Sequence, residues 1–236
     1  EDSADVDFRV ESDNNTHAMF VQGSTGNVGI GTSPARTLDV NGPHVTVASG
    51  QAVMTVGTSD SYAIDKGGSI GFVPINASNG DSTVIASVFG FKENGTSANI
   101  AGYLGFGTRA NGAAMAEKMR ISSTGNVGIG TIAPEGRLHV YNGSSGATTV
   151  NVSHDDLVIE NSDNVGIQLF SPADKYQYLA FGDPGSANRG YVRYYHTDDR
   201  MVLRAGASDT LYIMGSRVGI GTASPSSLLE IGASSN

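Results

Sequence analysis

One short string, VGIG, occurs three times in this chain of 236 residues and constrains its fold more than any other feature. The three copies contain Val28, Val127 and Val218 at the same position. Self-similarity at a nearly regular spacing is the signature of a chain built from repeated structural units. The sequence therefore predicts three units that share one motif.

The similarity extends on both sides of the motif. Before it lies an alternating apolar triplet, and after it come a proline and a second alternating segment. Alternation of this kind indicates short β-strands. The spacer between triplet and motif varies in length and is rich in Gly, Ser and Thr, as expected of a surface turn. The triplets are 19–21, 119–121 and 211–213, and the later segments are 37–40, 137–140 and 228–231.

The repeats predict three parts of the chain: a truncated first repeat (1–45), a second repeat (46–142) and a third repeat (143–236). "GYLGFGT" at 102–108 parallels "GYVRYYH" at 190–196, and "GGSIGF" at 67–72 loosely parallels "YLAFG" at 178–182. Asn-Gly pairs between alternating segments predict hairpin turns. These pairs lie at 79–80, 94–95, 111–112 and 142–143.

Composition favours an all-β protein. The chain has 32 Gly, is rich in other turn-forming residues, and contains only 7% aromatic residues with no Trp. "AAMAEKMR" at 113–120 consists of strong helix formers, but its repeat position predicts a strand, and we give the repeat more weight. Large apolar side chains are sparse for a core of this length. We therefore expect burial against other chains.

Charge and cysteine content exclude several classes of protein. The net charge of −9 disfavours binding to nucleic acid. The absence of cysteine excludes disulfides and thiolate metal sites. No apolar run is long enough for membrane insertion. The histidines lack metal-binding spacings, so we expect no metal and no cofactor.

The glycines of the motif first suggest a nucleotide-binding loop. Gly26, Gly29 and Gly31 reverse the order of a dinucleotide fingerprint, however, and no amphipathic helix follows to hold a phosphate. In a strand, Val28 and Ile30 would lie on one, buried face and the glycines on the other, where a neighbouring backbone could approach closely. We expect that neighbour to be an identical chain. The predicted trimer-packing residues are Val28, Gly29, Ile30, Gly31, Val127, Gly128, Ile129, Gly130, Val218, Gly219, Ile220 and Gly221.

Chemistry-bearing residues point to binding rather than catalysis. Carboxylates such as Glu117 and Asp183 are available for glycoside hydrolysis, but they are dispersed and Trp is absent. We therefore expect no enzymatic activity. Tyrosines and arginines cluster in the third repeat and suit a glycan or protein receptor, although the same tyrosines could form a core. The predicted receptor contacts are Tyr176, Tyr195 and His196.

"MRISSTGNVGIGTIAPEGRLHV" at 119–140 resembles a segment of bacteriophage tail fibres and related virion proteins, often found upstream of an endosialidase-type intramolecular chaperone domain. The first and third copies match in part, and the third departs at Ser216-Arg217. The resemblance implies an elongated, intertwined parallel homotrimer with β-helix or β-prism shaft segments and small β-rich modules. It also implies a chaperone that removes itself, with Asn236 close to the cleavage point.

The predicted function is a structural part of an extracellular virion tail fibre that supports host attachment. Its partners would be two further copies of the chain, other virion tail proteins, and host surface glycan or protein. The alternative is a receptor-recognition adhesin module, and the third interpretation is a polysaccharide depolymerase.

Overall fold

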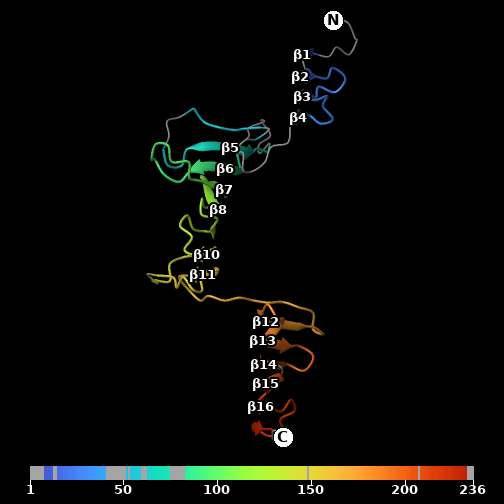
Figure 1. The fold of residues 1–236 in the computed structure, drawn as a ribbon, viewed down its shortest axis with the longest axis vertical. Helices are drawn as coiled ribbons and strands as arrows, with labels where there is room; N and C mark the ends of the chain where they lie inside the picture. Colours follow the sequence, from blue (N-terminus) through green and yellow to red (C-terminus); the bar gives the residue numbers. More distant parts are fainter. Residues whose placement is uncertain are drawn as a thin grey trace. The chain divides into compact units, whose positions relative to one another are not determined.

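A computed structural model describes residues 8–12, 15–40, 52, 54–59, 63–74, 83–147, 149–206 and 208–232. In this part of the chain every regular element is a β-strand, which confirms the all-β prediction (Figure 1). The strands form three separate sheets. The chain divides into two compact units, Glu1–Asn164 with the first two sheets and Val165–Asn236 with the third.

The first sheet has four strands and the second has seven. The first contains β1 (Phe8–Ser12), β2 (Asn15–Val21), β3 (Val28–Ile30) and β4 (Leu38–Val40). The second contains β5 (Gly67–Phe72), β6 (Ala86–Lys92), β7 (Gly102–Arg109), β8 (Met115–Ile121), β9 (Val127–Ile129), β10 (Leu138–Asn142) and β11 (Leu157–Asn161).

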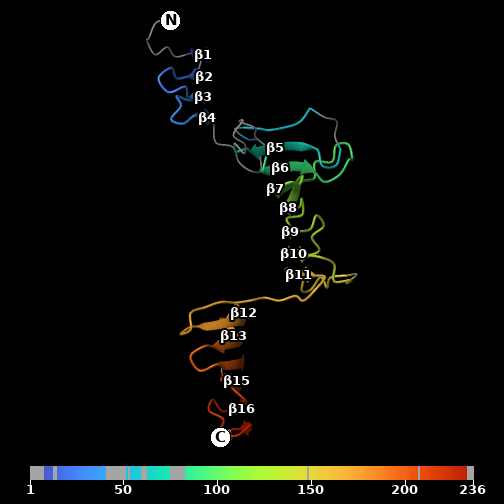
Figure 2. The same ribbon diagram turned by 180° about the vertical axis from the view of Figure 1, so that it is seen from behind.

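The third sheet has six strands and belongs to the second unit. It contains β12 (Tyr176–Asp183), β13 (Ser186–Tyr195), β14 (Arg200–Ala205), β15 (Ser208–Met214), β16 (Arg217–Ile220) and β17 (Leu229–Ile231). In all three sheets the spatial order of the strands equals their order in the sequence (Figures 1 and 2).

Each sheet begins as an antiparallel meander and ends in parallel pairing. The motif strands β3, β9 and β16 pair parallel with the next strands, β4, β10 and β17. Parallel neighbours usually need a crossover of about a dozen residues or more. Here the proline-containing segments 31–37, 130–137 and 221–228 suffice, because they connect strands of only three to five residues.

The structure confirms the strands predicted from the repeat. All three triplets and all three later segments lie in or overlap strands. The helix-forming stretch at 113–120 lies largely in β8, because pairing with β7 and β9 on both sides outweighs local propensity.

The Asn-Gly turns are confirmed in part. The pair at 111–112 joins the antiparallel strands β7 and β8, and the pair at 94–95 lies between β6 and β7. The hairpin predicted at 142–143 is wrong, since the next strand, β11, returns to pair parallel with β10. The pair at 79–80 lies outside the described residues.

The sheets also correct one sequence parallel. Counted from the first strand of each sheet, β7 corresponds to β14, whereas the strings at 102–108 and 190–196 lie in β7 and β13. Their similarity is therefore offset by one strand. β11 pairs with the strands of the second repeat although it lies within 143–236, and the predicted repeat boundaries stay a prediction.

The buried core is thin. Within the described residues, the buried apolar side chains are those of Phe20, Phe89, Tyr103, Tyr191 and Val202. Many large apolar side chains are exposed instead, and a row of them lies on one face of each sheet, as described next.

Candidate functional site

A continuous row of apolar side chains crosses one face of each sheet. Such directly opposed side chains are the unit of sheet stabilisation. We call each row an apolar ladder. In the second sheet, consecutive pairing partners are Ile70, Val88, Phe106, Met119, Ile129, Val140 and Ile159. In the third sheet they are Leu179, Val192, Leu203, Leu211, Ile220 and Ile231. In the first sheet they are Phe8, Val21, Val28 and Leu38.

The apolar ladders are open to solvent in the single chain. Ile30, Ile129 and Ile220 of the motif are 45%, 40% and 40% exposed. Contiguous exposed apolar surface on a soluble protein indicates an interaction face. The valines and isoleucines of the motif were predicted to form a buried face. In the single chain the valines are half-buried and the isoleucines are exposed, and burial of this face against another chain stays a prediction. Segments 54–56 and 167–169 of the same chain lie beside Ile70 and Leu179, at the first strands of two ladders.

The central glycine of each motif is buried by its own chain. A Cβ added to Gly128 would lie 2.5 Å from the carbonyl oxygen of Thr131. Gly29 and Gly219 face Thr32 and Thr222 even more closely. The expected close approach of a backbone at this position therefore exists, and the backbone is that of the following loop. The assignment of these glycines to trimer packing stays a prediction.

The loop after each motif strand has the same three structural features: a glycine with positive φ and two hydrogen bonds. Gly31, Gly130 and Gly221 begin it with φ of +75°, +79° and +70°, which glycine adopts without strain. A side chain at the centre of the parallel strand then accepts a hydrogen bond from the backbone N–H four residues earlier, just after the proline. These acceptors are Asp39 for Ala35, His139 for Glu135 and Glu230 for Ser226. Third, the valine of each motif donates its N–H to the carbonyl of Thr37, Arg137 or Leu228.

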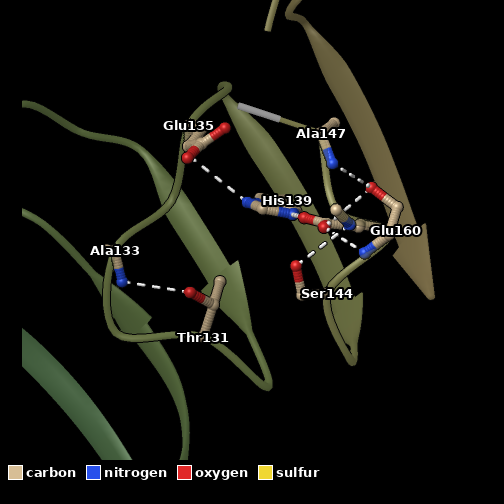
Figure 3. A network of polar contacts seen from close by, with 9 residues as sticks. Thr131, Ala133, Glu135, His139, Ser144, Ala147 and Glu160 are labelled. Atoms are coloured by element: carbon tan, nitrogen blue, oxygen red, sulfur yellow. Dashed lines mark hydrogen bonds and ion pairs between the residues drawn. The ribbon is translucent and has the colours of Figure 1, made fainter. Parts of the chain in front are cut away.

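His139 is the buried member of this series, with 2% of its surface exposed (Figure 3). Its Nδ1 accepts from Glu135 at 3.3 Å, so the proton of the neutral ring is on Nε2. Nε2 faces Glu160 Oε2 at 3.4 Å. Hydrogen bonds from the backbone and side chain of Ser145 lower the pKa of Glu160. The network ties β10 to β11 and needs no metal.

A β-bulge shapes the face opposite the ladder in the second sheet. Gly107 pairs with Glu117 and Phe106 with Met119, so Lys118 is the extra residue. In a regular strand, residues three apart lie on opposite faces. The bulge brings Glu117 and Arg120 to the same face, where they form a two-pronged ion pair at 2.5 and 2.9 Å.

This pair belongs to a larger aromatic cluster. The Arg120 guanidinium lies 3.8 Å from the centre of the Tyr103 ring, and Tyr103 donates to Asp65 at 2.7 Å. Burial, followed by the hydrogen bond to Asp65, raises the pKa of Tyr103. Phe89 and Phe91 pack edge-on against the same ring. The polar groups of this cluster are thus hydrogen-bonded or ion-paired to one another.

The third sheet carries an equivalent bulge with different side chains. Arg204 pairs with Asp209 and Leu203 with Leu211, so Thr210 is the extra residue. Asp209 accepts hydrogen bonds from the Tyr191 hydroxyl and, at 3.0 Å, from Arg193. Burial is the main cause that raises the pKa of Tyr191, and the bond to Asp209 adds to it.

The three predicted receptor contacts do not form one site. Tyr176 and Tyr195 are cross-strand partners whose rings stack with centroids 4.1 Å apart. Tyr176 is 42% exposed, so this pair presents an aromatic surface. His196 instead packs edge-on against Tyr194, which alternates with Tyr195 along β13.

Two pockets lie on the sheet faces opposite the apolar ladders. The larger, of about 690 Å³, is in the second sheet and is lined mainly by the aromatic cluster, with Ser87, Gly107 and Met115. The other, of about 540 Å³, is in the third sheet. Its lining residues are Tyr178, Ala180, Asn188, Tyr191, Arg193 and Arg204.

Sequence reasoning missed the loop acceptors and both bulge-centred networks. The acceptors carried a signal: a polar residue occurs at the same place after each proline, at Asp39, His139 and Glu230. The contact of Tyr103 with Asp65 joins residues that are 38 apart in the sequence, and no local sequence signal predicts it. Within the described residues, no group of three potential metal ligands occurs, and no helix is long and apolar enough to cross a membrane.

No protein-family model and no curated protein sequence matches the chain. Several solved chains are similar to it in structure. The chain resembles a bacteriophage tail fibre domain. The carboxy-terminal domain of the bacteriophage T5 L-shaped tail fibre aligns with 15% identity and a TM-score of 0.36, over 74% of this chain and 87% of that chain. The same domain with its intramolecular chaperone domain aligns with 15% identity and a TM-score of 0.35, over 74% and 60%. Sequence identity and TM-scores of this size support no statement about the activity of this chain.

Proposed function

We propose that the chain is a non-enzymatic structural component of an extracellular virion tail fibre. Three copies would associate in parallel, through their apolar ladders, to form a shaft that carries small β-rich modules. The motif "MRISSTGNVGIGTIAPEGRLHV" at 119–140, which resembles tail fibre segments, supports the class of protein. The other virion tail proteins would be its further partners.

The observation that carries the proposal is the apolar ladder. It is maintained without a polar interruption across every strand of the second and third sheets. Burial of apolar surface contributes about 25 cal/mol per Å². Thirteen strands each contribute an apolar side chain to a ladder, and the ladders are open in one chain. A second and a third copy that cover this face best explain both facts.

Sedimentation velocity and native mass spectrometry test the proposal. We expect a stable trimer of the 24.3 kDa chain, with the frictional coefficient of an elongated particle. Ile129→Asp and Ile220→Asp place a charge at the centre of two ladders and should each reduce the trimer at micromolar concentration. Thr124→Asp and Ser216→Asp, in the turns before the motif, are the matched controls and should assemble normally. A compact monomer of the unaltered chain would refute the proposal.

A second candidate function is favoured by the exposed tyrosine stack. The Tyr176–Tyr195 pair suits a receptor-recognition module that binds host surface glycan or protein. Tyr176→Ala should then weaken attachment to host cells while the trimer persists. Tyr212→Phe, in the same sheet, keeps the ring and should attach normally. Attachment unchanged by loss of Tyr176 would refute this function.

A further inference from the structure

The pocket of the third sheet stays accessible when the apolar ladder is covered. Tyr178 and Ala180 flank the ladder residue Leu179, and Tyr191 and Arg193 flank Val192. Because successive side chains of a strand point to opposite faces, the pocket and the ladder lie on opposite sides of one sheet. A partner on the ladder therefore leaves the pocket open.

The wall of this pocket is cationic. The guanidinium carbons of Arg193 and Arg204 lie 5.0 and 5.5 Å from the centre of the Tyr191 ring. No described lining residue carries a carboxylate, and Asp209 offsets one of the two charges through its bond to Arg193. In the described part of the chain, the buried Nε of Arg193 has no hydrogen-bond partner. An anion in the pocket would supply this N–H with an acceptor.

The equivalent positions of the second sheet carry no arginine, although the two sheets share the same strand pairing. By cross-strand register, Arg193 takes the place that Phe89 has in the second sheet, and Arg204 takes the place of Gly107. The two pockets therefore occupy equivalent positions, and one is aromatic where the other is cationic. The whole net charge of −9 lies in residues 1–164, since residues 165–236 contain six basic and six acidic residues.

We propose that the pocket binds a carboxylate-bearing saccharide, such as a uronic acid unit of a surface polysaccharide. The carboxylate would lie between Arg193 and Arg204, since guanidinium groups recognise carboxylates through paired, charge-assisted hydrogen bonds. The Tyr178 ring, 44% exposed beside them, would pack on the apolar face of the sugar. The Asn188 amide would bond a hydroxyl. This inference rests on the second candidate function.

The test compares a charged sugar with its neutral counterparts on the full 236-residue chain. Calorimetric or NMR titration with D-glucuronate should show saturable binding, weakened by added salt. D-glucose and the methyl ester of glucuronate, which lack the charge, should bind about tenfold more weakly or worse. Inorganic phosphate should compete weakly, because it lacks a ring for Tyr178.

Two variants locate the site. Arg204→Gln should weaken glucuronate binding about tenfold. Arg189→Gln is the matched control, since Arg189 lies on the neighbouring strand β13, is paired with Asp183 and does not line the pocket. It should bind within about twofold of the unaltered chain. Near-ultraviolet circular dichroism of the tyrosines verifies that both variants fold.

Four results would overturn the inference. They are equal affinity for glucose and glucuronate, phosphate binding as tight as glucuronate binding, equal losses in the two variants, and no binding of glucuronate. If cell attachment still depended on Tyr176 in any of these cases, the second candidate function would stand and the acidic-sugar pocket alone would fail.

Discussion

The second and third sheets share a backbone plan and differ in what they place on it. Both run as a four-strand meander with a bulge before the motif strand, and in both the bulge carbonyl, of Lys118 or Thr210, accepts from the glycine that ends the motif. Their ladders are apolar at each of the six shared positions. The opposite face is aromatic and self-paired in one sheet, and rich in tyrosine and arginine in the other.

This difference shows which face each sheet can vary. The ladder is constant in character, as expected of a face that must fit other copies of the chain. The face opposite the ladder differs at equivalent positions. Ser87 and Phe89 of the second sheet correspond to Tyr191 and Arg193 of the third sheet. Variation confined to one face leaves assembly intact while the binding chemistry changes.

The largest expected loss of stability comes from placing an arginine, as at Arg193 of the third sheet, at the equivalent position Phe89 of the second sheet. Phe89→Arg removes the ring that packs over Gly105 and adds a second cation to the cluster of Arg120, where Glu117 is already paired with Arg120 and Asp65 already accepts from Tyr103. We expect a loss of about 4 kcal/mol in the free energy of unfolding, measured by chemical denaturation. Asn111→Arg, in a surface turn, should change it by less than about 0.5 kcal/mol. A stable Phe89→Arg protein would show that the two faces are interchangeable.

The ion pair beside the bulge comes next. Glu117→Leu leaves the largely buried Arg120 without its carboxylate and should cost about 3 kcal/mol. The double change Glu117→Leu with Arg120→Met should recover most of that loss, because an apolar pair replaces a broken ionic one. Asp209→Leu in the third sheet should cost less, since Arg193 keeps contacts with three tyrosine rings. Hydrogen exchange resolved by sheet provides the measurement, and equal protection in both single variants would contradict the comparison.

The buried glycine of the motif should tolerate no side chain. Gly128→Val would drive the loop at 130–137 off the sheet, at a cost of about 2 kcal/mol, and should impair trimer assembly if the loop shapes that interface. Gly166→Val is the matched control, because nothing lies within 4 Å of an added Cβ there and this glycine lies outside the sheets. Faster amide exchange confined to the loop is the expected signature. Unchanged exchange would mean that the loop is not held by this contact.

The smallest effect is on the pH dependence of the third-sheet loop. Hydrogen bonds from the backbone and hydroxyl of Ser226 lower the pKa of Glu230. A lowered pKa means that the carboxylate stabilises the loop above its usual pKa, and that this contribution is lost as the pH falls through the lowered value. The protection factors of the loop amides, which are exchange rates corrected for the intrinsic pH dependence, should therefore fall on acidification below about pH 4.5. Glu230→Gln should remove that pH dependence, and persistence of the dependence would assign it to another group.

Much of the strand pattern could be predicted from the repeats. Period-two alternation and Gly-rich turns are local signals, so the strands around Val28, Val127 and Val218 follow from the sequence. Parallel pairing of β11 could not be predicted, because it depends on a return of the chain through residues 143–156 that carries no local signature. At the motif, the structure adds a neighbour that the sequence did not indicate, because the loop that covers Gly128 belongs to the same chain. The packing of the motif against other copies stays a prediction.

Strand order identical to sequence order has a consequence for how the molecule forms. Within each sheet, strands pair only with their neighbours in sequence, so contacts are local along the chain and contact order within each sheet is low. A sheet of this kind can add strands one at a time from its first hairpin, with no long loop to close beforehand. By the same logic, insertion or deletion of one whole sheet breaks no pairing in the others. Such a gene can be lengthened or shortened by recombination between copies of the motif, while the remaining sheets still fold.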